Sequence, residues 1–92
     1  MGSMVVTMKI MPESIEADLE KIKTDVKKKI TDFVGETEIK FSVEPVAFGL
    51  KSISAIFVID ESIESLDDFE NDVKKIENVQ SAEISDLRRT VG

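Results

Sequence analysis

Six apolar residues between positions 15 and 33 recur at steps of four, three, four, four and three, with charged residues in most of the gaps. They are Ile15, Leu19, Ile22, Val26, Ile30 and Phe33. This spacing predicts one long amphipathic helix with a single apolar stripe. Ser14 is expected to cap its start, and Gly35 stands where a helix C-cap belongs. Such a stripe has to be buried against another layer, so the other segments must supply one.

Two segments on either side of this helix alternate apolar and polar residues with the period of a β-strand. In residues 5–11, every second residue from Val6 to Ile10 is apolar, and Pro12 ends the alternation. Residues 39–44 repeat the pattern. Both segments therefore predict half-buried strands.

Two further segments predict the remaining strands. Residues 50–60 begin with alternation and end in the continuous apolar run 55–59. Such a run is typical of a central strand covered on both faces. Residues 80–89 alternate until Leu87 breaks the phase, which predicts a fourth strand, with a bulge as one explanation of the break.

A second, shorter helix is predicted between the last two strands. Its apolar residues step by three, four and three: Leu66, Phe69, Val73 and Ile76. Ser65 is expected to open it, with Asp67 and Asp68 in the first turn, where the helix dipole favours acids. Asn78 is expected to close it, because Asn tolerates the left-handed C-cap conformation.

The element order is therefore β-α-β-β-α-β, without linkers or repeats. Each helix has one apolar stripe, so both helices must cover one face of the sheet. With right-handed crossovers, this predicts an α+β fold: a ferredoxin-like βαββαβ sandwich with a four-stranded antiparallel sheet, whose first and third strands are central.

Composition narrows the class of protein. The chain has 92 residues, a net charge of −7, no Cys and no His, so disulfide scaffolds and thiolate metal sites are excluded. We expect no direct binding to nucleic acid, which requires basic surfaces, and no membrane span. Residues 1–3 are interpreted as an expression remnant or a disordered start, and residues 4–92 as a single domain. Cytoplasmic localisation is expected.

The sequence offers little to an enzyme. It contains neither the P-loop pattern nor G-x-S-x-G, and an acylphosphatase-like site would need an Arg after the first strand. The acidic pairs at 60–61 and 67–68 are explained by a turn and by a helix start, so we predict no metal and no cofactor. Phe57 lies in the third strand, where an RNA-recognition module stacks bases, but that module's basic motif is missing and core packing is expected.

Two features remain that packing explains poorly. Phe48 and Gly49 stand at the corner between the second and third strands, where a turn is usually polar. The structural alternative is a positive-φ glycine with the Phe folded back onto the core. Arg88 and Arg89 lie near the end of an acidic chain. The structural alternative there is a solvated tail that protects a strand edge.

Three stretches, "KIMPES", "EPVAFGLKSI" and "ISDLRR", give the chain a resemblance to the archaeal translation elongation factor 1-beta family. This family is similar to the C-terminal guanine nucleotide exchange domain of the eukaryotic beta subunit. The resemblance implies the ferredoxin-like fold and a non-enzymatic function: promoting GDP-for-GTP exchange on elongation factor 1-alpha. The chain would bind that GTPase and disturb its Mg²⁺ and phosphate site.

The resemblance also implies contact residues for the GTPase. Phe48 falls on the family's exposed Phe, with Gly49 beside it, and the surrounding motif is matched by Pro45, Ala47, Leu50 and Lys51. Arg89, with Arg88 adjacent, falls on a Lys that in eukaryotic relatives reaches toward the Mg²⁺ and phosphate region. Arg and Lys are not interchangeable at such a position.

A different class of function stays open at this point. Ferredoxin-like modules also sense ligands or dimerise through their sheets, and Val5, Ile56 and Val58 are expected on the face away from the helices. Light scattering separates the two hypotheses, because the exchange factor is expected to be a monomer when free.

Overall fold

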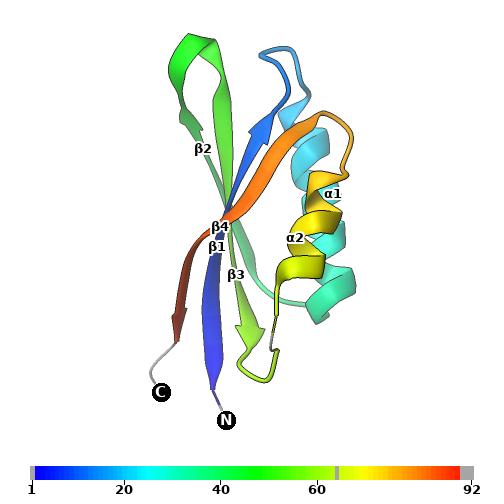
Figure 1. Ribbon diagram of the computed structural model, residues 1–92, viewed down its shortest axis with the longest axis vertical. Coiled ribbons are helices and arrows are strands. Elements are labelled where there is room, and N and C mark those ends of the chain that lie inside the picture. Colours follow the sequence, from blue (N-terminus) through cyan, green and yellow to red (C-terminus); the bar gives the residue numbers. More distant parts are fainter. Residues whose placement is uncertain (1, 64, 90–92) are drawn as a thin grey trace.

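The predicted element order is present in the computed structural model, which describes residues 2–63 and 65–89. The four strands are β1 (Ser3–Pro12), β2 (Ile39–Pro45), β3 (Lys51–Asp60) and β4 (Val79–Arg89). The two helices are α1 (Leu19–Val34) and α2 (Asp67–Lys74). All strand pairs are antiparallel, and the order across the sheet is β2-β3-β1-β4, so the ferredoxin-like fold and the central position of β1 and β3 are confirmed (Figure 1).

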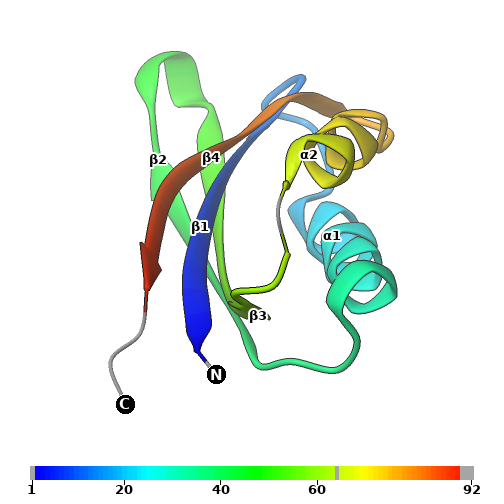
Figure 2. The ribbon, with the colours of Figure 1, turned by 60° about the horizontal axis from the view of Figure 1, so that its bottom comes forward.

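Both helices cover the same face of the sheet (Figure 2). The core between the layers is formed by alternate residues of the two central strands and by the helix stripes, including Val6, Met8, Ile10, Ile22, Val26, Ile30, Ile53, Ala55, Phe57, Phe69 and Val73. Phe57 is buried and meets the ring of Phe69 edge-on, with centroids 5.7 Å apart. Its expected role in the core is therefore confirmed.

The start of α1 differs from the prediction. The helix begins at Leu19, and the Asp18 side chain caps it by accepting hydrogen bonds from the backbone N–H groups of Glu20 and Lys21. Ser14 lies four residues earlier in a turn, where its hydroxyl oxygen accepts from the Glu16 N–H. Ile15 therefore does not join the apolar stripe and is exposed. The prediction failed because two good cap residues, Ser14 and Asp18, stand near the start of the periodic segment and periodicity cannot choose between them.

This correction gives a first testable prediction. We expect Asp18→Ala to lower the free energy of unfolding by about 1 kcal/mol, because two N–H groups of the first turn lose their acceptor. For a domain of this size, that corresponds to a fall in Tm of about 4–8 °C. Ser14→Ala is the matched control and should change stability by less than about 0.5 kcal/mol. Thermal unfolding of the two variants decides the matter; a larger loss for the Ser14 variant would restore Ser14 as the cap.

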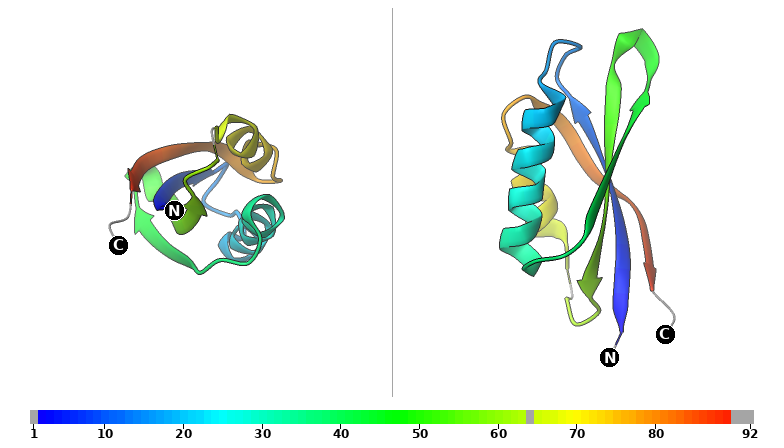
Figure 3. Two further views of the ribbon diagram at one scale, coloured as in Figure 1. Left: turned by 90° about the horizontal axis from the view of Figure 1, so that it is seen from below. Right: turned by 180° about the vertical axis from the view of Figure 1, so that it is seen from behind.

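The third strand is central, as predicted, but only one of its faces is covered. Ile53, Ala55, Phe57 and Ile59 point into the core, whereas Ile56 and Val58 are 36% and 39% exposed on the face away from the helices. The expectation of cover on both faces was wrong, because both helices lie on the same side. Both views in Figure 3 show the helices on one side of the sheet and the other face left bare.

The fourth strand contains the bulge that its broken alternation suggested. Its register with β1 shifts between Thr7 and Met8, so that Ser85 is the extra residue. Leu87 then pairs with Val6 and lies on the helix side of the sheet, as Ile84 does. The bulge therefore accounts for the phase change.

The second helix is shorter than its apolar stripe. It begins at Asp67, and the Ser65 hydroxyl oxygen accepts from the Asp67 N–H. It ends at Lys74, so Asn78 does not close it; Asn78 has the expected positive φ of 70° but lies in the turn into β4. Gly35, in contrast, ends α1 as predicted, with a φ of 82° and its N–H bonded to the Thr31 carbonyl.

Within the described ranges, neither helix has the length and apolar character needed to cross a membrane.

Candidate functional site

The hairpin that joins β2 to β3 ends in a tight turn with two consecutive residues of positive φ. Phe48 has φ 62° and ψ 29°, and Gly49 has φ 78°. The Leu50 N–H donates to the Ala47 carbonyl, and the Val46 N–H donates to the Leu50 carbonyl at 2.8 Å. These features describe a turn of the I′ kind, whose central positions favour Asn-Gly or Asp-Gly because both require φ above zero.

Phe48 is therefore an unfavourable residue for the position that it occupies. A side chain with a Cβ in the left-handed region is destabilised by roughly 1–2 kcal/mol. Packing does not offset this cost, because the Phe48 side chain is 95% exposed. The alternative of a Phe folded back onto the core is wrong. The turn presents an aromatic ring to solvent from a backbone with little freedom, and strain of this kind gathers at functional positions.

The neighbouring residues of the hairpin are also on the surface. Pro45 and Lys51 form the last Cα pair of the β2–β3 ladder, and both are exposed, as are Ala47 and Gly49. The fold thus brings these four residues and the exposed phenylalanine together at one end of the sheet, and Leu50, the sixth hairpin residue that the resemblance singled out, is half-buried beside them. Lys51 contributes a cation beside them.

Arg88 and Arg89 lie at the opposite end of the sheet. Arg89 pairs with Met4 and Arg88 with Val5, in the same region where Ser3 pairs with Asp60. β3 spans ten residues from Lys51 to Asp60, which at about 3.3 Å per residue is roughly 30 Å. In Figure 1 the hairpin tip is at the top and the red end of β4 is at the bottom. The seven predicted contact residues therefore form two groups and not one cluster.

Each of these arginines has a carboxylate partner. Arg88 Nε lies 2.7 Å from Asp86 Oδ2, and Arg89 Nε lies 3.6 Å from Glu61 Oε2. Both arginine side chains are more than three-quarters exposed, so the pairs contribute about 0–1 kcal/mol each and are easily exchanged for another anion. Nearby, the backbone N–H and hydroxyl of Ser62 hold the pKa of Asp60 below its usual value.

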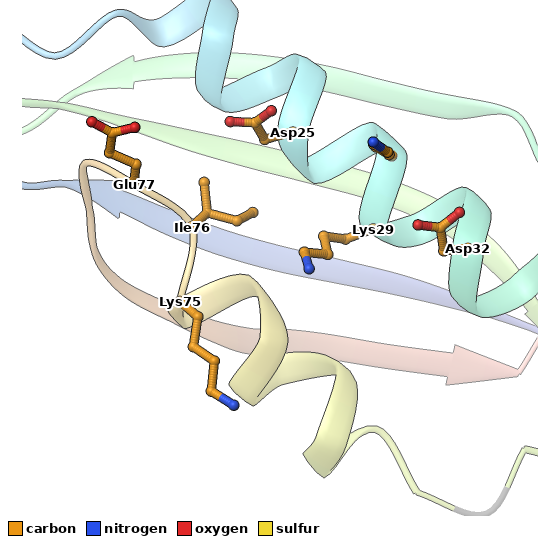
Figure 4. A pocket seen from close by; sticks show the side chains of 7 residues that line it. Asp25, Lys29, Asp32, Lys75, Ile76 and Glu77 are labelled. Atoms are coloured by element: carbon orange, nitrogen blue, oxygen red, sulfur yellow. The ribbon is translucent and has the colours of Figure 1, made fainter.

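A groove with a mixed charge lies between the helices. Figure 4 shows Asp25, Lys29 and Asp32 of α1 on one side of it, with Ile76 and Glu77 on the segment after α2. It contains charges of both signs, and Lys75 points away from α1. Within residues 2–63 and 65–89, no three carboxylates converge in a way that could hold a metal ion.

Sequence reasoning missed Glu61 and Asp86 as partners of the arginines. Asp86 could have been found, because residues two apart on a strand point to the same face. Glu61 could not have been found, because its approach to Arg89 depends on the register of β3, β1 and β4.

Comparisons with known proteins agree on one family. The sequence model of the EF-1 guanine nucleotide exchange domain matches residues 5–90. A protein of Methanobrevibacter smithii named elongation factor 1-beta is 39% identical over 90 residues, covering 97% of this chain and 98% of its own. One of the same name from Nanoarchaeum equitans is 47% identical over 77 residues, covering 84% and 93%. The de novo designed protein Foldit4 shares the fold, with a TM-score of 0.66, 16% identity and 98% coverage of both chains.

Proposed function

The chain belongs to the EF-1 guanine nucleotide exchange domain family and promotes nucleotide exchange on elongation factor 1-alpha, and from this we propose that it contacts the GTPase through both ends of its sheet. The hairpin group consists of Pro45, Ala47, Phe48, Gly49 and Lys51. The arginine group consists of Arg88 and Arg89. The observation that carries the proposal is Phe48, a strained aromatic residue that the fold leaves 95% exposed.

The hairpin group provides docking affinity. Aromatic side chains have only two rotatable bonds and lose little entropy on binding, and they are frequent among the residues that dominate protein interfaces. Gly49 keeps the turn tight, and Lys51 adds a charge at its edge. This part of the contact does not need to distinguish between nucleotide states of the GTPase.

The arginine group provides the difference in affinity between the nucleotide-free and the GDP-bound GTPase. A protein speeds GDP release only if it binds the nucleotide-free GTPase more tightly than the GDP-bound form. In our proposal Arg89 leaves Glu61 and reaches the phosphate and Mg²⁺ region, where a cation competes with the metal. The resemblance of the closing "ISDLRR" segment to the eukaryotic tail supports this placement. The chain itself makes and breaks no covalent bond.

The distance between the groups limits the mode of binding. Roughly 30 Å along a strand is about the diameter of a small domain. One GTPase must therefore lie along the length of the sheet, with its nucleotide site at the arginine end.

The test of the function is the release of a fluorescent GDP analogue from the cognate elongation factor 1-alpha. Addition of the chain at stoichiometric concentration is expected to accelerate release, and the acceleration should saturate as the complex forms. Absence of any acceleration, in a preparation whose thermal unfolding is cooperative, would contradict the proposal.

We also propose that the free chain is a monomer and acts in the cytoplasm, where its GTPase works. Ile56 and Val58 on the bare sheet face are only about one-third exposed, and the register places Lys40 and Asp86 in the same row as Ile56. Val5 pairs with Val58 on the same face, and we expect these three apolar residues between charged neighbours to be too few for a stable dimer. A dimer in sedimentation at micromolar concentration would instead favour the sheet-pairing alternative.

A further inference from the structure

A second exposed apolar side chain lies beside the hairpin tip, on a segment distant in the sequence. Ile15 is 67% exposed. Its Cγ2 methyl lies 3.6 Å from the place that a Cβ on Gly49 would occupy. Figures 1 and 3 show the loop between β1 and α1 at the same end of the molecule as the hairpin. Ile15 and Phe48 are therefore large exposed apolar residues on two neighbouring segments.

The loop that carries Ile15 is fixed on both sides. The Glu13 N–H donates to the Asn78 carbonyl at 2.8 Å, and the Ala17 N–H donates to the Ser14 carbonyl at 3.3 Å. The capped start of α1 follows at once. Ile15 is thus presented by an ordered turn, and the core of the protein does not use its side chain.

We infer that Ile15 and Phe48 form one apolar contact patch for elongation factor 1-alpha. This inference rests on the proposed function and extends its hairpin group by a residue from another part of the chain. A partner that covers Phe48 is expected to reach Ile15 as well, because the Ile15 methyl lies 3.6 Å from where a Cβ on Gly49, the neighbour of Phe48, would stand. Contiguous exposed apolar residues mark protein contacts more reliably than single ones.

The charges around this patch indicate what faces it. Glu13 and Glu16 flank Ile15, and Glu44 precedes the hairpin tip; all three are exposed. These three acids outnumber Lys51, the cation of the hairpin group, so the complementary surface is an apolar pocket of the GTPase bordered mainly by Lys or Arg side chains. The arginine group at the far end instead requires an anionic surface. The chain can therefore bind in only one direction.

The test is the GDP-release assay with Ile15→Ser. We expect the concentration of the variant that gives half-maximal acceleration to rise about five- to tenfold, because a partly buried aliphatic contact is lost. The maximal release rate should stay within about twofold of wild type, because nucleotide-state discrimination resides at the other end. Ile15→Met keeps an apolar side chain and should restore half-maximal acceleration to within about twofold of wild type.

Val58→Ser is the matched control, since it removes an exposed apolar side chain from the bare sheet face. The inference is overturned if Ile15→Ser behaves like Val58→Ser, or if Ile15→Met is as defective as Ile15→Ser. It is also overturned if sedimentation shows a wild-type dimer that Ile15→Ser dissociates, because the patch then binds a second copy. A wild-type chain that fails to accelerate GDP release refutes the proposed function itself, which is a separate result.

Discussion

Phe48→Asn is expected to make the protein more stable and a worse exchange factor. Asn tolerates the left-handed conformation, and Asn-Gly is the preferred pair for a turn of this kind. The free energy of unfolding should rise by about 1 kcal/mol, because the strain on a bulky residue at φ 62° is relieved. This corresponds to a rise in Tm of about 4–8 °C.

The same substitution removes the exposed ring. An aromatic residue at the centre of a contact typically contributes about 2 kcal/mol or more, so half-maximal acceleration should require roughly 30-fold more of the variant. Stability and function then change in opposite directions, which general unfolding cannot produce.

Phe48→Ala is the control for this pair of results. It removes the ring but keeps a Cβ at the left-handed position, so it should lose exchange activity to the same extent while its stability stays close to wild type. A destabilised Asn variant would mean that the ring supports the fold. Full exchange activity in both variants would remove Phe48 from the contact.

Arg89→Ala is expected to affect the rate of GDP release more than the formation of the complex. If Arg89 acts only once it has reached the phosphate region, its loss should lower the maximal release rate by about tenfold, a difference of roughly 1.4 kcal/mol. The half-maximal concentration should change by less than about threefold, because the hairpin group supplies most of the affinity. Stopped-flow fluorescence over a range of concentrations separates the two quantities.

Three further variants sharpen this result. Arg88→Ala removes the neighbouring cation of the arginine group, which is paired with Asp86, and measures how much of the effect belongs to that residue. Glu61→Gln leaves Arg89 in place without its 3.6 Å partner, so release should be at least as fast as wild type and at most about fivefold faster, because an exposed pair contributes little. Arg89→Lys tests whether a point charge suffices. Equal losses in rate and affinity for Arg89→Ala would indicate simple docking.

The topology could be predicted from the sequence because each element has its own periodicity. The stripe from Leu19 to Phe33 and the alternation in residues 5–11 fix one helix and one strand, and the remaining segments follow the same logic. The helix start could not be predicted, since Ser14 and Asp18 are both good caps. The bare face of β3 was missed because an unbroken apolar run does not say on which side the helices lie.

The residues of the candidate site stay a prediction from the sequence, and their arrangement could not be predicted. Phe48 is conspicuous as an aromatic residue next to a turn glycine, yet its positive φ and its exposure are properties of the folded hairpin. Arg88 and Arg89 were predicted as a second set of contact residues, but only the register shows that they lie about 30 Å from the hairpin tip. Ile15 was assigned to the core by its spacing, and only the position of the helix cap leaves it outside.

The continuity of β3 has a consequence for how this protein can change over time. One strand begins at Lys51 in the hairpin group and ends at Asp60, next to the Glu61 that holds Arg89. The length of β3 therefore sets the distance between the hairpin group and the arginine group. The surface residues of β3 are free to vary, but a single inserted residue would exchange the two faces of the strand. Two inserted residues would move one group by about 7 Å relative to the other. If the GTPase contacts both groups as proposed, it constrains the length of this strand even at positions that it never touches.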